Sequence, residues 1–211
     1  MTTTEPIIVA RALSRKFGAQ TVLDHLDLSV APGEKVGFRG PNGSGKTTAL
    51  RCLAGTLTPT SGELTIGGHA AGSAGARRIV GASLAQERSF YLRLTGFENL
   101  RFFARLRHKT KRMAEEDVSQ IVDELQIAPI AAQRVAKCST GMVQQLAFAR
   151  ALLAAPRVIL LDEPTRSLDD DAIERLWSAL DARPEATVVM ASHHHADLDR
   201  CERVLDFGGE G

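Results

Sequence analysis

The chain reads Gly40-Pro41-Asn42-Gly43-Ser44-Gly45-Lys46-Thr47-Thr48 one residue after the apolar run 36–38. The stretch matches the pattern G-x-x-x-x-G-K-[ST], and residues 49–54 after it are typical of a helix. This motif binds phosphate in the context of strand, glycine loop and helix, which is the order found here. It indicates an α/β chain organised around a phosphate-binding loop, and a Gly-rich turn with an exposed lysine is the weaker alternative.

The residue types of the loop suit a phosphate ligand. Its glycines allow positive φ angles and close approach, so that backbone N–H groups can point into one concavity. Lys46 can reach the β- and γ-phosphates of a nucleotide, and the N-terminus of the next helix adds partial positive charge. The Thr47 hydroxyl is a candidate ligand for Mg²⁺. The residues predicted to bind nucleotide are Gly40, Pro41, Asn42, Gly43, Ser44, Gly45, Lys46, Thr47 and Thr48.

Length and composition restrict the class of protein. A chain of 211 residues is long enough for one domain with a full core. The net charge of +1 gives no reason to expect a nucleic-acid partner. The three cysteines lack the spacing of a zinc site or a disulfide framework, which favours a reducing compartment. Because no run of about 18 apolar residues and no leader-like N-terminus occurs, we expect a soluble chain that is not exported.

The hydrophobic pattern divides the chain into three parts. The stretches 7–13 and 22–30 predict an antiparallel pair of strands near the N-terminus. Strand and helix patterns then alternate, as in a mainly parallel sheet, except at about 88–138, where two helical patterns follow each other. We therefore predict a single domain, 1–211. Its core comprises about 1–87, including the antiparallel part, and about 139–211, and a helical subdomain is inserted at about 88–138.

A run of basic residues lies within the predicted helical subdomain. Such runs are usually solvated helix faces, and we favour this interpretation over a partner-binding surface. The run comprises Arg101, Arg105, Arg107, His108, Lys109, Lys111 and Arg112.

Two adjacent acids follow the continuous apolar run 158–161. Such a run is typical of a strand buried on both faces of a parallel sheet, and side chains at its carboxyl end face the ligand crevice. One of the two carboxylates can hold Mg²⁺, while its neighbour can orient and polarise the water that attacks a γ-phosphate. An ordinary acidic turn before Pro164 is the alternative.

The stretch Cys138-Ser139-Thr140-Gly141-Met142-Val143-Gln144-Gln145 predicts a second anion site. Ser139 and Gly141 place a hydroxyl and backbone N–H groups at the start of a helix. The stretch lies far along the sequence from Lys46, beyond the helical insertion. We therefore expect that one subunit does not bring both sites onto the same phosphate.

With these residues the chain closely resembles the ATP-binding cassette (ABC) transporter family over nearly its whole length. Residues 40–48 resemble the Walker A loop, 158–163 resemble Walker B with its catalytic glutamate, and 138–144 resemble the family signature. Further residues match shorter motifs in the expected order. They are the adenine-stacking aromatic Phe17, the Q-loop glutamine Gln86, Ser167-Leu168-Asp169 of the D-loop and the switch histidine His193.

The resemblance implies an ATPase that works as a head-to-tail pair, with a homodimer preferred. Each ATP would lie between the Walker motifs of one subunit and Ser139, Thr140, Gly141 and Met142 of the other, with Asp169 at the dimer contact. Catalytic roles would fall to Glu163, His193 and Gln86, and Mg²⁺ would be held by Thr47, Gln86 and Asp162. A separate integral membrane permease subunit would couple hydrolysis to transport, with this chain on the cytoplasmic face of the cell membrane.

Three signature positions depart from the family pattern. Cys138 stands where Leu or Tyr is usual, Thr140 replaces the first Gly and Met142 replaces Gln. The last two resemble the exporter branch that moves drugs, polyketides, polysaccharides or haem, so we predict export. Asp170 replaces the common Pro after the D-loop.

Three assignments have structural alternatives. Phe17 is a core aromatic in the alternative interpretation. His193-His194-His195 could suggest a metal site, but we expect consecutive side chains to diverge, which favours a single functional His193. Cys138 could be a nucleophile, although no histidine partner is identified for it.

Two other classes of function share the phosphate loop. A small-molecule kinase is disfavoured by the adjacent Asp162-Glu163 and by the Ser139 stretch. A non-transport cassette protein of DNA repair or translation typically has long coiled-coil insertions or two cassettes, which this chain lacks.

Overall fold

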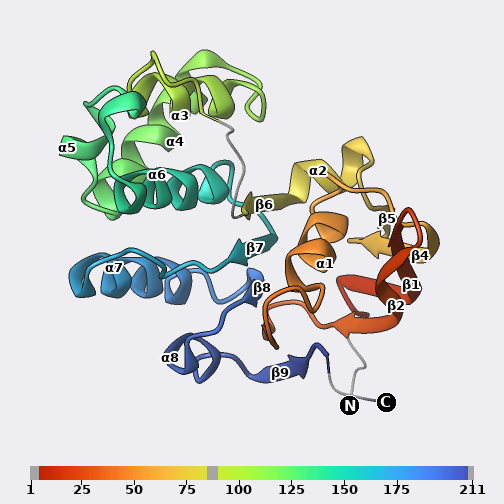
Figure 1. The fold of residues 1–211 in the computed structure, drawn as a ribbon. Coiled ribbons are helices and arrows are strands. Elements are labelled where there is room, and N and C mark those ends of the chain that lie inside the picture. Colours follow the sequence, from red (N-terminus) through yellow and green to blue (C-terminus); the bar gives the residue numbers. More distant parts are fainter. Residues whose placement is uncertain (1–4, 85–89, 209–211) are drawn as a thin grey trace.

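The computed structural model describes residues 5–84 and 90–208 and contains two sheets (Figure 1). One sheet is antiparallel, with strand order β2-β1-β4-β5. It confirms the predicted N-terminal pair, which is joined by a tight turn at Gly18 and Ala19. Its strands are β1 (Ile8–Phe17), β2 (Gln20–Val30), β4 (Ser61–Ile66) and β5 (His69–Ala70).

The second sheet is parallel, in the order β6-β7-β8-β3-β9, and confirms the predicted α/β core. Its strands are β3 (Lys35–Arg39), β6 (Val80–Ser83), β7 (Val158–Asp162), β8 (Thr187–Ala191) and β9 (Arg203–Asp206). Because parallel strands all end at one edge, the loops after β3, β7 and β8 meet there. These loops begin at Gly40, Glu163 and Ser192.

The strands β7 and β8 are buried on both faces, which explains their continuous apolar runs. Along β7, Val158 and Leu160 belong to the hydrophobic cluster that also contains side chains of the antiparallel sheet and of α1 (Lys46–Leu53). Ile159 and Leu161 point to the other face and join the cluster of the helices. Because successive side chains of a strand point to opposite faces, β7 contributes side chains to both hydrophobic clusters.

The predicted insertion contains a group of helices that packs on one side of the parallel sheet (Figure 1). It comprises α3 (Gly96–Arg105), α4 (Lys111–Glu124), α5 (Ala128–Ala131) and a 3₁₀ turn (Val135–Lys137). Thr95 and Glu98, three residues apart, form a capping box at the start of α3. The helix α6 (Thr140–Leu152) contacts both this group and the strands β6 and β7, so it joins the helices to the sheet.

The remaining helices are α2 (Ala74–Ile79), α7 (Asp170–Asp181) and α8 (His195–Leu198). The helix α2 ends at residue 79, and β6 follows directly and covers 80–83.

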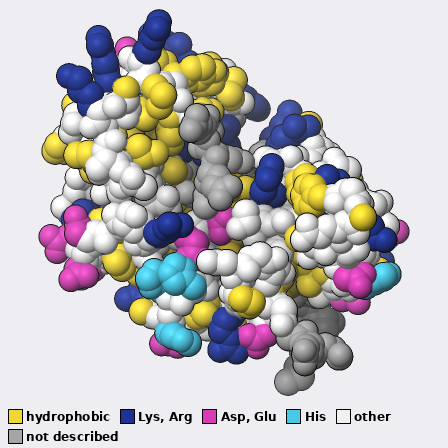
Figure 2. Space-filling model, in the orientation of Figure 1, with side chains coloured by type: hydrophobic (Ala, Val, Ile, Leu, Met, Phe, Trp, Pro, Cys, Tyr) yellow, Lys and Arg dark blue, Asp and Glu magenta, His cyan; other side chains and the backbone are white. Residues whose placement is uncertain are grey.

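Part of the basic run is not a solvated face. The Nη2 atom of Arg107 donates hydrogen bonds to the backbone oxygens of Arg78 and Val80 (3.2 and 3.0 Å), and burial lowers the pKa of its guanidinium group. His108 contacts Asp117 through its Nε2 atom at 2.7 Å. The solvated interpretation is therefore wrong for these two residues. The others are exposed, and Figure 2 shows Lys and Arg side chains standing out over the helical group.

Candidate nucleotide site

The phosphate loop borders a cavity of about 730 Å³ at the carboxyl edge of the parallel sheet. The backbone of the loop requires glycine. Gly40 has a φ of +153°, and a Cβ atom there would lie 2.1 Å from the backbone oxygen of Phe207. At Gly45, with a φ of +102°, a Cβ atom would lie 2.8 Å from the oxygen of Val22. The residues lining the cavity are Gln20, Val22, Asn42, Gly43, Ser44, Gly45, Lys46, Thr47, Thr48, Asp162, Glu163, Arg166 and His193.

The loop presents positive groups to this cavity. Lys46 is 7% exposed, and its ammonium group donates to the oxygens of Gly40 and Pro41 at 2.7 and 2.9 Å. The first turn of α1 has Gly45 as its N-cap and no side-chain cap. Its N–H groups are therefore directed at the cavity without a competing side chain, as a phosphate site requires.

Hard oxygen atoms that suit Mg²⁺ meet beside the loop. The Thr47 hydroxyl donates to Oδ2 of Asp162 at 2.8 Å, and Asp162 is 3% exposed. The Oγ atom of Ser44 is buried and has no hydrogen-bond partner within residues 5–84 and 90–208. A hydroxyl and a carboxylate in contact, with another unsatisfied oxygen nearby, fit a Mg²⁺-phosphate group. The third predicted metal and catalytic residue, Gln86, lies outside the described residues.

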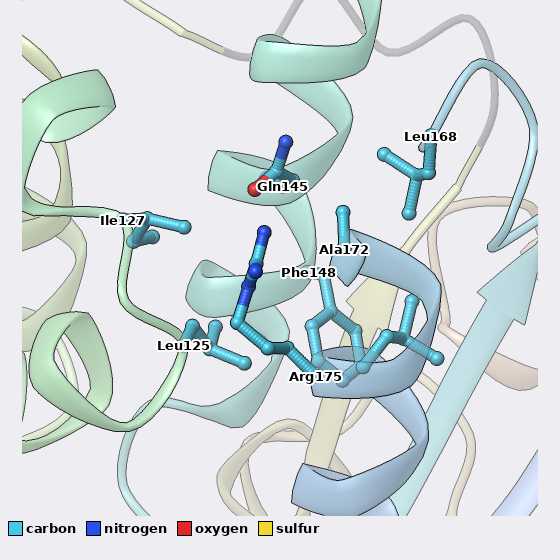
Figure 3. Close-up of a pocket in the computed structure, with 8 residues that line it drawn as sticks. Leu125, Ile127, Gln145, Phe148, Leu168, Ala172 and Arg175 are labelled. Carbon is cyan, nitrogen blue, oxygen red and sulfur yellow. The ribbon is translucent and has the colours of Figure 1, made fainter. Parts of the chain in front are cut away.

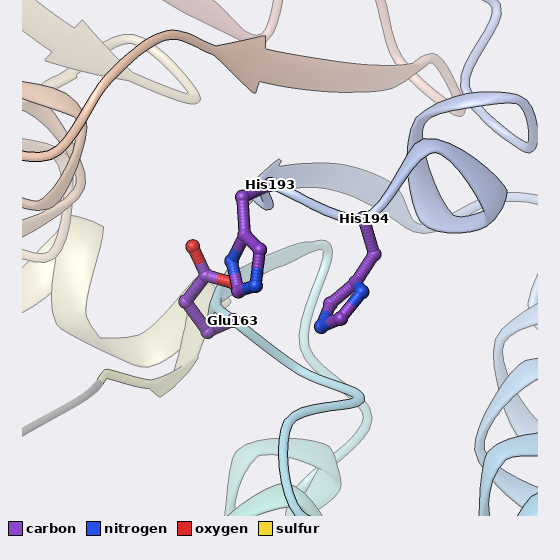
Figure 4. Close-up of side chains that lie close together, drawn as sticks. All are labelled: Glu163, His193 and His194. Atoms are coloured by element: carbon purple, nitrogen blue, oxygen red, sulfur yellow. The ribbon is translucent and has the colours of Figure 1, made fainter.

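Glu163 and His193 come from neighbouring strands and meet at the cavity (Figure 4). Glu163 follows β7 with a φ of +50°, and its backbone N–H donates to the oxygen of Ala191 at 2.8 Å. Its Oε2 atom lies 2.5 Å from Nδ1 of His193. Both candidate catalytic groups therefore face the same space as the phosphate loop.

The expectation that the consecutive histidines diverge is wrong for His193 and His194. Their rings lie 4.1 Å apart between centroids, tilted by 37° (Figure 4). The alternation of a strand does not apply, because β8 ends at Ala191 and both residues lie in the bend before α8.

A buried acid that the sequence did not indicate connects the loops that follow β7 and β8. Asp197 is 2% exposed, and its Oδ2 atom accepts hydrogen bonds from the hydroxyls of Thr165 and Ser192 at 2.8 and 2.7 Å. Ser192 in turn accepts from the backbone N–H of His194 at 3.0 Å. Thr165 follows Glu163 by two positions and Ser192 precedes His193, so one carboxylate holds both loops. The only sign of this role in the sequence is that an acid, Asp197, occupies a position of the helical segment that faces the core.

Replacing this acid is expected to loosen both loops. In Asp197→Ala, two buried hydroxyls lose their acceptor, which lowers the free energy of unfolding by about 2–3 kcal/mol. The rate of ATP hydrolysis is expected to fall as well. Urea denaturation and phosphate release measure the two effects. Asp199→Ala is the matched control because Asp199 is exposed, and equal stability of the two variants would contradict the bridging role.

The residues of the predicted signature do not line the cavity. Ser139 is the N-cap of α6 and accepts from the N–H of Met142 at 3.2 Å, while the sulfur of Met142 accepts from the N–H of Ser139 at 3.4 Å. Ser139 and Thr140 are exposed. The exposed end of this helix thus lies at the surface and outside the lining of the cavity in its own chain.

Gly141 is required for the packing of α6 against the D-loop. A Cβ atom at Gly141 would lie 2.3 Å from the backbone oxygen of Ser167. We expect Gly141→Ala to push these segments apart and to reduce ATP hydrolysis by about ten-fold or more, since a small displacement of a catalytic element is costly. Gly68→Ala is the control, because its Cβ meets nothing within 4 Å; the strain from its positive φ, which Gly141 does not have, makes the comparison more stringent. Similar activity of both variants would contradict this prediction.

Two other predicted residues lie at the surface. Asp169 is exposed and caps α7, accepting from the N–H of Ala172 at 2.8 Å. Phe17 is 44% exposed and lies beneath the guanidinium of Arg15, 4.5 Å from the ring centroid. The alternative that Phe17 is a core aromatic is therefore wrong. It is not a lining residue of the cavity, although Gln20 and Val22 of the adjacent strand are.

The cysteines offer no reactive thiolate. Burial raises the pKa of Cys52 and of Cys201 to about 11. Burial also raises the pKa of Cys138, whose sulfur lies 3.6 Å from the oxygen of Arg134. A nucleophilic role needs a lowered pKa, so these shifts argue against the alternative interpretation of Cys138.

A second hollow, of about 10 Å³, lies where the helical group meets α6 and α7 (Figure 3). Its walls are mainly apolar and include Ile127, Phe148 and Leu168, with the side chain of Arg175 across it. Such a volume holds at most about one water molecule. It is a packing gap between segments and not a ligand site.

The glycine loop after β3, the acid pair at the end of β7 and the histidine after β8 define a P-loop nucleoside triphosphatase. The family model described as "ABC transporter" matches residues 23–166. The chain therefore belongs to the ABC transporter family and is an ABC-type ATPase domain, which confirms the family predicted from the motifs.

Two known ATP-binding proteins are similar to this chain in sequence. The chain is 33% identical over 203 residues to the probable multidrug ABC transporter ATP-binding protein YbhF of Escherichia coli, covering 95% of this chain and 35% of that protein. It is 37% identical over 206 residues to the sulfate/thiosulfate import ATP-binding protein CysA of Bordetella parapertussis, covering 94% and 58%. The chain thus spans less than two thirds of either relative.

A solved structure is also similar. The dimeric post-hydrolysis state of the ATP-binding cassette MJ0796, bound to ADP and phosphate, has a TM-score of 0.85 and 25% identity, with 95% of this chain and 94% of that chain covered.

Proposed function

We propose that this chain binds ATP with Mg²⁺, hydrolyses it in a head-to-tail pair, and thereby powers export of a substrate through a separate membrane subunit. One observation carries the proposal. Glu163 and His193 lie on the same cavity as Lys46 and Thr47, whereas the exposed Ser139 end of α6 does not. The chain thus has the Walker half of a hydrolytic site in one place and its signature half in another.

Each group in the cavity has a role that suits phosphoryl transfer. Lys46 and the N–H groups of the loop neutralise the β- and γ-phosphates, and Thr47 with Asp162 holds Mg²⁺, together with Gln86. The bound Mg²⁺ supplies further positive charge to the triphosphate. Glu163 orients and polarises the attacking water, and His193 contacts the γ-phosphate. Positioning and electrostatics of this kind carry most of the catalysis in such reactions.

A second subunit would supply the remaining contacts. Ser139, Thr140, Gly141 and Met142 of one copy would approach the γ-phosphate held by the other, with Asp169 at the contact. The similar cassette MJ0796 is a dimer in its solved post-hydrolysis structure, which supports a paired arrangement. We favour a homodimer because one chain carries every one of these groups.

A membrane partner is required for transport. No helix in the described part of the chain is long and apolar enough to cross a bilayer. We propose that the chain binds the cytoplasmic face of an integral permease through the helical subdomain at about 88–138. The Thr140 and Met142 variants and the multidrug relative support export. Because one of the relatives is an import protein, the direction of transport is the first point to test.

Two measurements test this function. Phosphate should be released from ATP without any acceptor molecule, and Lys46→Ala should abolish the release. A requirement for an acceptor would favour the kinase alternative. The permease that co-purifies with the tagged chain would then be placed in inside-out membrane vesicles. Accumulation of its bound substrate in the vesicles on addition of ATP is expected for an exporter, and depletion of preloaded vesicles would establish import.

A further inference from the structure

Three potential metal ligands converge at the edge of the nucleotide site. Oxygen or nitrogen atoms of Glu163, His193 and His194 all lie within 4.8 Å of one another (Figure 4). In the part of the chain that the structure describes, no other group of three His, Cys, Asp or Glu residues meets this condition. The group unites the end of β7 with the bend after β8.

His194 lies beside the nucleotide site and is not one of its residues. Glu163 and His193 line the cavity, whereas His194 does not. His194 stacks beside His193, and its backbone N–H is held by the Ser192 hydroxyl, which Asp197 fixes in turn. The backbone of His194 is therefore held in place by a buried network, while its imidazole, which hydrolysis as proposed above does not use, stays free to turn.

A second observation points to a cation at this position. The Oε2 atom of Glu163 is buried and has no hydrogen-bond partner in residues 5–84 and 90–208, although it lies 2.5 Å from Nδ1 of His193. The two atoms are therefore close together, but they are not aligned as a hydrogen bond requires. Two atoms with lone pairs repel each other at this separation, so the pair attracts a cation. A proton fits the distance as it stands, and a metal ion fits once the exposed imidazole of His193 moves outward to about 3.4 Å from the carboxylate.

The donor set selects the class of metal. Two imidazoles and one carboxylate are the ligands of catalytic-type Zn²⁺ sites, which leave a fourth position open. Mg²⁺ prefers an all-oxygen octahedron and loses its waters reluctantly, so it competes weakly here. Bonds to Zn²⁺ of about 2.0–2.2 Å require ligand atoms within about 4 Å of one another. Both imidazoles are exposed, so rotation of their side chains can reach this geometry.

We propose that Glu163, His193 and His194 form an inhibitory site for Zn²⁺ or a similar divalent transition metal. The bound ion occupies the carboxylate needed for the attacking water and the imidazole needed for the γ-phosphate. ATP turnover then stops until the metal leaves. The inhibition rests on the function proposed above, whereas the binding of the metal does not.

Binding is tested directly, without nucleotide. Zn²⁺ is titrated against a chromophoric chelator in the presence of the full chain, with any polyhistidine tag removed. One equivalent is expected to bind, and His194→Ala should weaken the affinity by about ten-fold or more. His195→Ala is the matched control, since His195 follows His194 directly, at the start of α8, but lies outside the group. Equal affinities of wild type and His194→Ala, or equal loss in both variants, would overturn the site.

Inhibition is tested separately. ATP hydrolysis is followed with Mg²⁺ fixed in excess while Zn²⁺ is raised, and each variant is normalised to its own rate without Zn²⁺. The zinc concentration for half inhibition is expected to rise about ten-fold in His194→Ala and not in His195→Ala, and a zinc-selective chelator should restore turnover. Metal binding without inhibition would refute the inhibitory role. An absence of ATP hydrolysis in the zinc-free protein would instead refute the proposed function and leave the binding result standing.

Discussion

Glu163→Gln is expected to lower ATP turnover by about 10²–10³-fold while the protein still binds ATP. The amide fills the same space at the end of β7 but cannot accept a proton from the attacking water. The contacts of Lys46 and Thr47 with the triphosphate do not depend on the carboxylate, so affinity should persist. Phosphate release and equilibrium binding of a fluorescent ATP analogue measure the two quantities.

The same variant should also accumulate an ATP-bound dimer, because hydrolysis is the step that opens the pair. Size-exclusion chromatography with light scattering, with ATP and Mg²⁺, would detect it. Glu174→Gln is the control, since it makes the same substitution on the exposed face of α7. Wild-type turnover in Glu163→Gln would remove the role assigned to this carboxylate.

Ser139→Asp is expected to reduce ATP turnover by about 10²-fold or more without unfolding α6. Aspartate caps a helix as well as serine does, so the hydrogen bond to the N–H of Met142 can be kept. A carboxylate in this position would face the γ-phosphate bound by the partner, and like charges in a desolvated site repel strongly. The melting temperature checks the fold, and phosphate release checks the function.

Complementation separates a composite site from a defect within one subunit. Ser139→Asp and Lys46→Ala are each expected to be inactive alone. In a mixed dimer, the intact Walker half of the first variant meets the intact signature half of the second. An equal mixture should therefore recover about one quarter of wild-type activity, since half of the dimers hold one working site of two. If the mixture stays as inactive as its components, the two-subunit site is wrong.

Local patterns were sufficient for much of the fold. The run 158–161 predicted a buried strand because its side chains fill two cores. Short elements were less predictable. The helix α2 has six residues, and β5 has two, so neither is long enough to show a periodic pattern.

Arg107 illustrates why burial of a charge is difficult to predict. In sequence it is one of several basic residues on a helical segment, and most of these are exposed. Only its guanidinium reaches the backbone oxygens of residues 78 and 80, which belong to the end of α2 and the start of β6. The direction of that side chain depends on how the helical group packs against the sheet.

The sequence by itself determined the phosphate loop, the acid pair and the family, because each depends on residues that are neighbours along the chain. A glycine loop binds phosphate through its own backbone, and the identity of the residues after a buried strand decides which groups stand at its end. The order of the parallel strands brings four residues together at the carboxyl edge of the sheet: Lys46, Asp162, Glu163 and His193. A pattern of neighbouring residues does not specify this order.

Only the tertiary structure showed that Asp197 joins the loops of Thr165 and Ser192, and that His194 stacks on His193 beside Glu163. Both arrangements arise in bends after β7 and β8, where neither helical nor strand periodicity directs the side chains. Their geometry is decided by long-range hydrogen bonds and by the proximity of two strands that are adjacent in the sheet but about 30 residues apart in the sequence.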